Sequence, residues 1–167
     1  MNKEASRNIP QIVKYGSNGF DELIKRFRTS SRNAFPILFA GYSEDLKTLA
    51  ADIIGVELNL DLYRANLSSL VNKHTGETEK NLDRVFSEAA EGNAIILLDE
   101  ADTLFGKRTE IKDTHDRYAN LEVTYLLQRI ENYNGIVILS TKHSNTIDEA
   151  LIRRMRYVVK FPSSLSR

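Results

Sequence analysis

The chain of 167 residues contains no cysteine. Without cysteine there are no disulfides, thiolate nucleophiles or thiolate metal ligands, and the composition fits a reducing compartment. The three histidines, His74, His115 and His143, lie far apart and are not part of a ligand cluster at the spacing of a metal site. The sequence therefore predicts neither a disulfide-stabilised fold nor a zinc centre.

The chain also lacks a net charge and a long apolar run. Lysine and arginine together number 23, as do aspartate and glutamate, so no overall field attracts nucleic acid or an anionic membrane. The longest apolar run, residues 94–98, is too short to cross a bilayer, and the N-terminus lacks the apolar segment of a secretion signal. We therefore expect a soluble, cytoplasmic domain without membrane contact, and we disfavour nucleic acid as a partner.

What the sequence does contain is an alternation of two kinds of segment. Segments with the period of a helix separate apolar runs of strand length, which lie at residues 37–40, 60–63, 94–98, 136–139 and 157–161. This alternation predicts an α/β fold in which helices cover both faces of a five-stranded parallel sheet, as in a three-layer α/β/α sandwich.

The N-terminal part of the chain has a different character. Residues 1–19 are polar and contain proline and glycine, which predicts an arm without regular structure. A short amphipathic helix is expected next, because four apolar residues recur at helical spacing: Phe20, Leu23, Ile24 and Phe27. We therefore divide the chain into an arm and helix at residues 1–34 and a core domain at residues 35–167.

Residues 41–48, GYSEDLKT, nearly match the phosphate-binding pattern G-x-x-x-x-G-K-[ST]. Gly41, Lys47 and Thr48 stand at matching positions, but Leu46 replaces the second glycine. A phosphate cradle turns backbone N–H groups inward, often with dihedrals that suit only glycine, so a leucine fits it poorly.

Two carboxylates make the same loop electrostatically unfavourable for phosphate. Glu44 and Asp45 would face a triphosphate, and one like-charge pair near 4 Å costs on the order of 4 kcal/mol at an effective dielectric constant of about 20. A helix start explains both residues, since Ser43 suits the N-cap and acids in the first turn complement the helix dipole. An apolar stripe is then predicted on this helix by the spacing of Leu46, Leu49, Ala50 and Ile53.

The run AIILLDEAD places Asp99 and Glu100 at the end of a buried strand. A nucleotide hydrolase needs such a pair, in which Asp99 would hold Mg²⁺ and Glu100 would polarise the attacking water. A buried strand before a helix that opens on acids would look the same. We expect both carboxylates to lack partners, so that neutralising either one leaves the melting temperature unchanged or raises it.

Three longer stretches come in the order and spacing of one family: SSLVNKHTGETEKNL at 68–82, ILLDEADTLFGKR at 96–108 and DEALIRRMR at 148–156. Residues 36–162 resemble the AAA+ ATPases, particularly a bacterial subgroup that shares GETEKNLDRVF, DEADTLFGKR and HDRYAN. Some members of that subgroup accompany contractile injection machines. The resemblance implies a P-loop NTPase-like core that binds ATP or ADP with Mg²⁺ and assembles with other AAA+ subunits into a homo- or hetero-oligomeric ring acting on a protein substrate.

The resemblance also implies a role for each matching residue. Lys47 would contact the β- and γ-phosphates with Gly41 in the same loop, Thr48 and Asp99 would hold Mg²⁺, and Glu100 would be the catalytic base. Lys142, in STK where relatives have ATN, would contact the γ-phosphate. As arginine fingers, Arg154 and Arg156 would reach a neighbouring subunit's site, although a solvated basic cluster would give the same pattern.

Several departures from the family leave three hypotheses open. The pore loop at residues 73–76, KHTG, lacks the family's aromatic-aliphatic pair, and the sequence ends at Arg167, where relatives continue into a helical lid. The first hypothesis is an AAA+ ATPase-like domain, related to protein-remodelling machines, whose ATP binding and hydrolysis are weakened or lost. The alternatives are a competent ATP-hydrolysing subunit and a non-catalytic structural or regulatory subunit of a ring.

Overall fold

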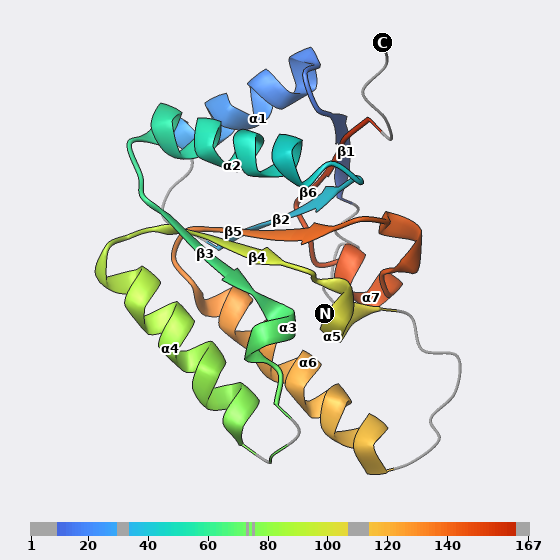
Figure 1. The fold of residues 1–167 in the computed structure, drawn as a ribbon. Coiled ribbons are helices and arrows are strands. Elements are labelled where there is room, and N and C mark those ends of the chain that lie inside the picture. The colour runs from blue at the N-terminus through green and yellow to red at the C-terminus, as the bar shows by residue number, and fades with distance from the viewer. Residues whose placement is uncertain (1–9, 30–33, 73, 75, 107–113, 163–167) are drawn as a thin grey trace, which may run out of the picture.

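The computed structural model describes residues 10–29, 34–72, 74, 76–106 and 114–162. Six parallel strands form one sheet in the order β1-β6-β2-β5-β4-β3 (Figure 1). The strands are β1 (Gln11–Lys14), β2 (Phe35–Ala40), β3 (Leu62–Asn66), β4 (Ile95–Asp99), β5 (Ile136–Thr141) and β6 (Tyr157–Lys160). The parallel sheet confirms the predicted fold class, with one strand more than the sequence analysis gave.

Helices cover both faces of this sheet. They are α1 (Asn18–Thr29), α2 (Glu44–Leu58), α3 (Leu67–Leu70), α4 (Glu77–Glu91), α5 (Asp102–Phe105), α6 (Thr114–Asn132) and α7 (Glu149–Ile152). Helices α1 and α2 lie on one face, and α4 and α6 lie side by side on the other (Figure 1). The three-layer arrangement is therefore confirmed.

Alternation along the central strands produces two hydrophobic cores. On β4, Ile95 and Leu97 belong to the core under α1 and α2, whereas Ile96 and Leu98 belong to the core under α4 and α6. Because all four side chains are fully or almost fully buried, each contributes about 1.5 to 3 kcal/mol to folding. This burial on both faces explains the uninterrupted apolar run.

The additional strand, β1, lies within the segment that we predicted to be an irregular arm. It pairs with β6 at the edge of the sheet, where Val13 is buried and Ile12 remains 63% exposed. A four-residue edge strand with one buried side chain leaves almost no alternation in the sequence, which explains the error. Helix α1 follows as predicted and buries Phe20, Leu23, Ile24 and Phe27.

Strand β1 and helix α1 share their hydrophobic core with α2 and the central strands. The proposed division at residues 34 and 35 stays a prediction. Nowhere in the described ranges is there a helix long and apolar enough to cross a membrane.

The predicted apolar stripe of α2 is wrong in detail. Leu49 is 50% exposed, whereas the buried face consists of Lys47, Ala50, Ala51, Ile54 and Gly55. Leu46 and Ile53 are partly buried at the margin of this face. The helix approaches its neighbours closely, because a Cβ added at Gly55 would lie 2.9 Å from the carbonyl oxygen of Leu60. Small side chains therefore determine which face is buried.

Candidate functional site

A polar cavity lies where strands β3, β4 and β5 end. Its volume is ≈ 370 Å³, and its lining includes Glu44, Arg64, Asp99, Glu100 and Lys142. Ligands of open α/β sheets bind outside the carboxyl ends of the strands, so this position suits a binding site. The structure thus brings four of the predicted site residues, Lys47, Asp99, Glu100 and Lys142, to one region.

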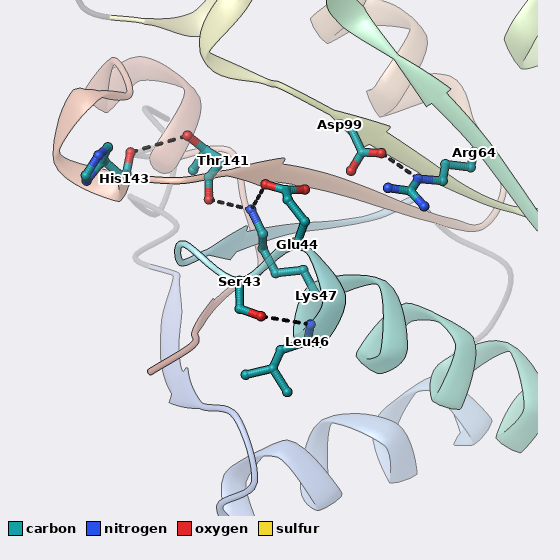
Figure 2. A network of polar contacts seen from close by, with 8 residues as sticks. All are labelled: Ser43, Glu44, Leu46, Lys47, Arg64, Asp99, Thr141 and His143. Carbon is teal, nitrogen blue, oxygen red and sulfur yellow. Dashed lines mark hydrogen bonds and ion pairs between the residues drawn. The ribbon is translucent and has the colours of Figure 1, made fainter. Parts of the chain in front are cut away.

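The N-terminus of α2 borders this cavity and is capped by the chain itself. Ser43 has extended backbone dihedrals, and its Oγ accepts a hydrogen bond of 3.2 Å from the N–H of Leu46 (Figure 2). This confirms Ser43 as the N-cap, with Glu44 and Asp45 in the first turn. A backbone donor that a phosphate would otherwise use is therefore already paired.

Lys47 is buried at the same helix end, with 1% of its surface exposed. Its Nζ lies 3.0 Å from Oε1 of Glu44 and donates to the carbonyl oxygen of Thr141 at 3.1 Å (Figure 2). A buried ammonium needs such partners, since an unpaired one carries a large desolvation cost. The lysine that the resemblance assigns to phosphate is thus neutralised by a carboxylate from its own loop.

Asp99 at the end of β4 also has a partner. The Nε of Arg64 donates to its Oδ2 at 2.6 Å, and this hydrogen bond raises the pKa of Arg64 (Figure 2). Arg64 was not among the sequence-predicted residues. The available signal was its position two residues before the end of β3, beside the strand that carries Asp99.

Glu100 follows Asp99 with a left-handed backbone conformation at φ 57°. Hydrogen bonds from the side chains of Ser68 and Asn66 lower the pKa of its carboxyl group, and the charge of Lys142 lowers it further. A non-glycine residue in this conformation stores strain of the kind found at functional sites. Because Asp99 and Glu100 both have partners, the expectation of unpaired acids is wrong.

The remaining loop positions have partly structural explanations. A Cβ added at Gly41 would lie 2.6 Å from the Cβ of Phe161, so packing against the end of β6 requires glycine there. Thr48 is half-buried on α2 beside Lys47, and Lys142 is exposed after β5. Of the pore-loop positions 73–76, Lys73 and Thr75 fall outside the described residues.

The two predicted arginine fingers lie at the opposite end of the sheet. Arg154 pairs with Glu131 at the end of α6, with Nη1 and Oε1 3.5 Å apart. The guanidinium of Arg156 lies 4.7 Å from the ring centroid of Phe35, the first residue of β2. Both arginines are exposed, and neither lines the cavity of its own chain.

The donor set of the cavity does not form a ready metal site. Within the described ranges, no three side chains of His, Cys, Asp or Glu are grouped so as to hold a metal ion. Asp99, the predicted Mg²⁺ ligand, is engaged by Arg64. In this arrangement, the residues of the cavity therefore fit a nucleotide with Mg²⁺ poorly. The roles of Thr48 and Asp99 as metal ligands stay predictions.

Comparisons with known proteins bear on the family to which the chain belongs. The family described as "ATPase family associated with various cellular activities (AAA)" matches residues 37–163. The chain is 35% identical over 109 residues to the "ATPase family gene 2 protein" of Schizosaccharomyces pombe. This match covers 64% of this chain and 14% of that protein. It is 32% identical over 127 residues to an "Uncharacterized AAA family ATPase y4kL" of Sinorhizobium fredii. This match covers 75% of this chain and 38% of that protein.

A third relative is "Spastin" of Xenopus tropicalis, which is 29% identical over 154 residues, or 87% of this chain and 25% of spastin. The chain thus spans well under half the length of these relatives. Members of this family in general use a nucleotide with magnesium and assemble into rings. Since the family match extends from the second strand to beyond the last, this chain belongs to the AAA family of ATPases.

Proposed function

We propose that this AAA domain keeps the outline of a nucleotide site but binds ATP weakly or not at all, so that hydrolysis is weakened or lost. The observation that carries the proposal is the ion pair between Lys47 and Glu44 within the loop itself. A bound triphosphate would have to take Lys47 from this carboxylate and then lie beside the displaced negative charge.

The charges around the cavity support the proposal. Four carboxylates line it, those of Glu44, Asp99, Glu100 and Asp102. Arg64 and Lys142 also line it, and the buried Lys47 brings the positive charges to three. A triphosphate carries several negative charges, and micromolar binding is worth only about 8 kcal/mol, so these acids can offset much of it.

The exposed arginines favour a second function, that of a structural or regulatory subunit in an AAA ring. Arg154 and Arg156 lie away from their own cavity, where a side chain can reach a neighbouring subunit's site. A subunit that binds no nucleotide could still supply these arginines to an active neighbour. As part of this proposal, we expect the chain to assemble into a ring that acts on a protein substrate. We also expect it to belong to the bacterial subgroup named above and to be cytoplasmic.

A competent ATPase is the alternative, because Lys47, Asp99 and Glu100 occupy the ends of a helix and a strand at the cavity. Titration calorimetry of residues 1–167 with Mg-ATP and Mg-ADP distinguishes a competent ATPase from a domain that binds nucleotide weakly or not at all. The comparison variant combines Glu44→Gly, Asp45→Thr and Leu46→Gly, which restores the family loop.

We expect heat of binding from the restored variant and little or none from the natural chain. Micromolar binding by the natural chain would show that the loop tolerates its carboxylates and would overturn the proposal. Adding Lys47→Ala to the restored variant is the control, because binding at the intended site must then be lost.

A further inference from the structure

A second polar groove lies at the opposite end of the sheet from the nucleotide-type cavity. It has a volume of ≈ 390 Å³ and lies between the last turns of α4 and α6 and the residues that lead into β4 and β5. Its polar lining consists of Ser87, Asn93, Arg129, Asn132 and Asn134, and no acidic residue lines it. The groove therefore has one cationic group and several amides, a composition unlike that of the first cavity.

Arg129 is held in place by packing rather than by hydrogen bonds. Its guanidinium lies 5.3 Å from the ring centroid of Phe86, and its buried Nε has no hydrogen-bond partner among the described residues. Arg129 forms an ion pair with Asp83, whose Oδ1 is 3.5 Å from Nε and also accepts a hydrogen bond from the hydroxyl of Tyr125. The side chain of Arg129 is 34% exposed, and a guanidinium has five N–H donors, so it can pair with Asp83 and still bind a second carboxylate in a planar, two-point geometry.

The ends of the two helices do not cancel this positive charge. Helix C-termini carry a negative potential because their last carbonyl groups lack partners. Here the carbonyl of Ala90 accepts the N–H of Asn93, that of Ala89 accepts the N–H of Ala94, and that of Ile130 accepts the N–H of Tyr133. These hydrogen bonds occupy carbonyls at both helix ends, and Arg129, which is paired with Asp83, is the one charged residue among those described that lines the groove.

The amides around Arg129 indicate which kind of carboxylate compound fits. Asn93, Asn132 and Asn134 each offer both a donor and an acceptor, as a peptide group does, whereas a phosphate or sulfate offers acceptors only. All three side chains are exposed and accessible to a partner. We propose that this groove binds a peptide segment of a partner protein that carries a carboxylate, with Arg129 holding the carboxylate and the asparagines pairing with the peptide backbone.

The test uses NMR spectroscopy of the ¹⁵N-labelled chain. The probes are an end-blocked tetrapeptide with one central aspartate, its asparagine analogue, tetra-alanine with a free C-terminus, and inorganic phosphate. We expect the aspartate peptide to shift the amide signals of residues 86–93 and 129–134 in a saturable way. The asparagine analogue and the Arg129→Gln variant each remove the charge-assisted pair between the peptide carboxylate and Arg129. Either change should weaken binding at least about tenfold.

Arg84→Gln is the matched control, since Arg84 is exposed on α4, the other helix that borders the groove, but does not line the groove itself. It should leave binding unchanged. If Arg129→Gln fails to fold, Arg129→Lys and Asn132→Ala replace it, and both should weaken the aspartate peptide. Binding of tetra-alanine as well would extend the site to C-terminal carboxylates. The proposal is overturned by absent or dispersed shifts, by equal weakening in Arg84→Gln, or by tighter binding of phosphate than of either carboxylate peptide.

Discussion

The Nζ of Lys47 lies 3.0 Å from Oε1 of Glu44, three residues earlier in the first turn of α2. The lysine is buried and the glutamate half-exposed. The resemblance to the AAA+ ATPases implies glycine at position 44, so the residue that adds a carboxylate there also supplies the lysine's partner. The contact therefore gives the proposed weakening of phosphate binding a direct physical cause in the loop sequence.

Replacing Glu44 by glutamine should strengthen nucleotide binding. The amide keeps the size of the side chain and removes the negative charge that competes with phosphate for Lys47. A tenfold tighter dissociation constant for Mg-ATP corresponds to about 1.4 kcal/mol, a small part of the roughly 4 kcal/mol of one close like-charge pair. Titration calorimetry measures the dissociation constant of Mg-ATP for the variant and for the natural chain.

Asp45→Asn is the control for this change, because Asp45 also carries a carboxylate and is exposed in the same turn but is not the partner of Lys47. A smaller gain is expected from it. Equal gains from the two variants would show that general charge, rather than the Lys47 contact, limits binding.

Asp99→Asn should destabilise the domain, contrary to the expectation from the sequence. Its carboxylate is mostly buried and accepts the 2.6 Å hydrogen bond from Arg64, whose side chain is 48% exposed. A double-mutant cycle with Arg64→Gln, measured by urea unfolding, should give a coupling free energy of about 0.5 to 1 kcal/mol.

The ion pair of Lys80 and Glu77 provides the comparison. It spans 3.8 Å on the surface of α4, with the side chains of Lys80 and Glu77 77% and 46% exposed, and its coupling should be close to zero. A coupling no larger for Arg64 and Asp99 than for this pair would mean that Asp99 gains nothing from its partner.

Much of the fold was predictable because its signals are local and periodic. The other five strands, β2 to β6, are mostly apolar and interrupt helical periodicity, so their existence is evident from residues such as those of β4. β1 was missed because only Val13 is buried in it. The face of α2 was misjudged because hydrophobicity ranks Leu49 above Ala50 and Ala51, whereas close packing of the helix favours the alanines.

The candidate site was predictable as a set of positions but not as a set of contacts. The resemblance implied that Asp99 and Lys142 face one nucleotide, and strand ends in a parallel sheet do meet at one edge. Arg64 could be found only from the register of β3 and β4, in which Asn66 lies beside Asp99. Lateral contacts of this kind depend on strand pairing, which leaves no periodic signal in the sequence.

The buried face of α2 gives a stability prediction. Ile54→Ala should cost about 2 to 4 kcal/mol, because the side chain is fully buried and its removal leaves a cavity. Leu49→Ala on the same helix should cost no more than about 0.5 kcal/mol, since half of Leu49 is exposed. Chemical denaturation of the two variants measures the difference. Similar losses would mean that the sequence-based stripe, rather than the observed face, is buried.

Glu100 predicts a pH dependence whose sign follows from its partners. Hydrogen bonds from Ser68 and Asn66 lower its pKa below the ordinary value of 4.5, so ionised Glu100 stabilises the folded state above that pH. This contribution is lost as the pH falls through the lowered pKa. Thermal melts from pH 7 to about pH 2.5 should therefore show a lower melting temperature for Glu100→Gln at neutral pH and a difference that shrinks in acid. Glu91→Gln, at the exposed end of α4, is the control, and a difference that stays constant with pH would contradict the assignment.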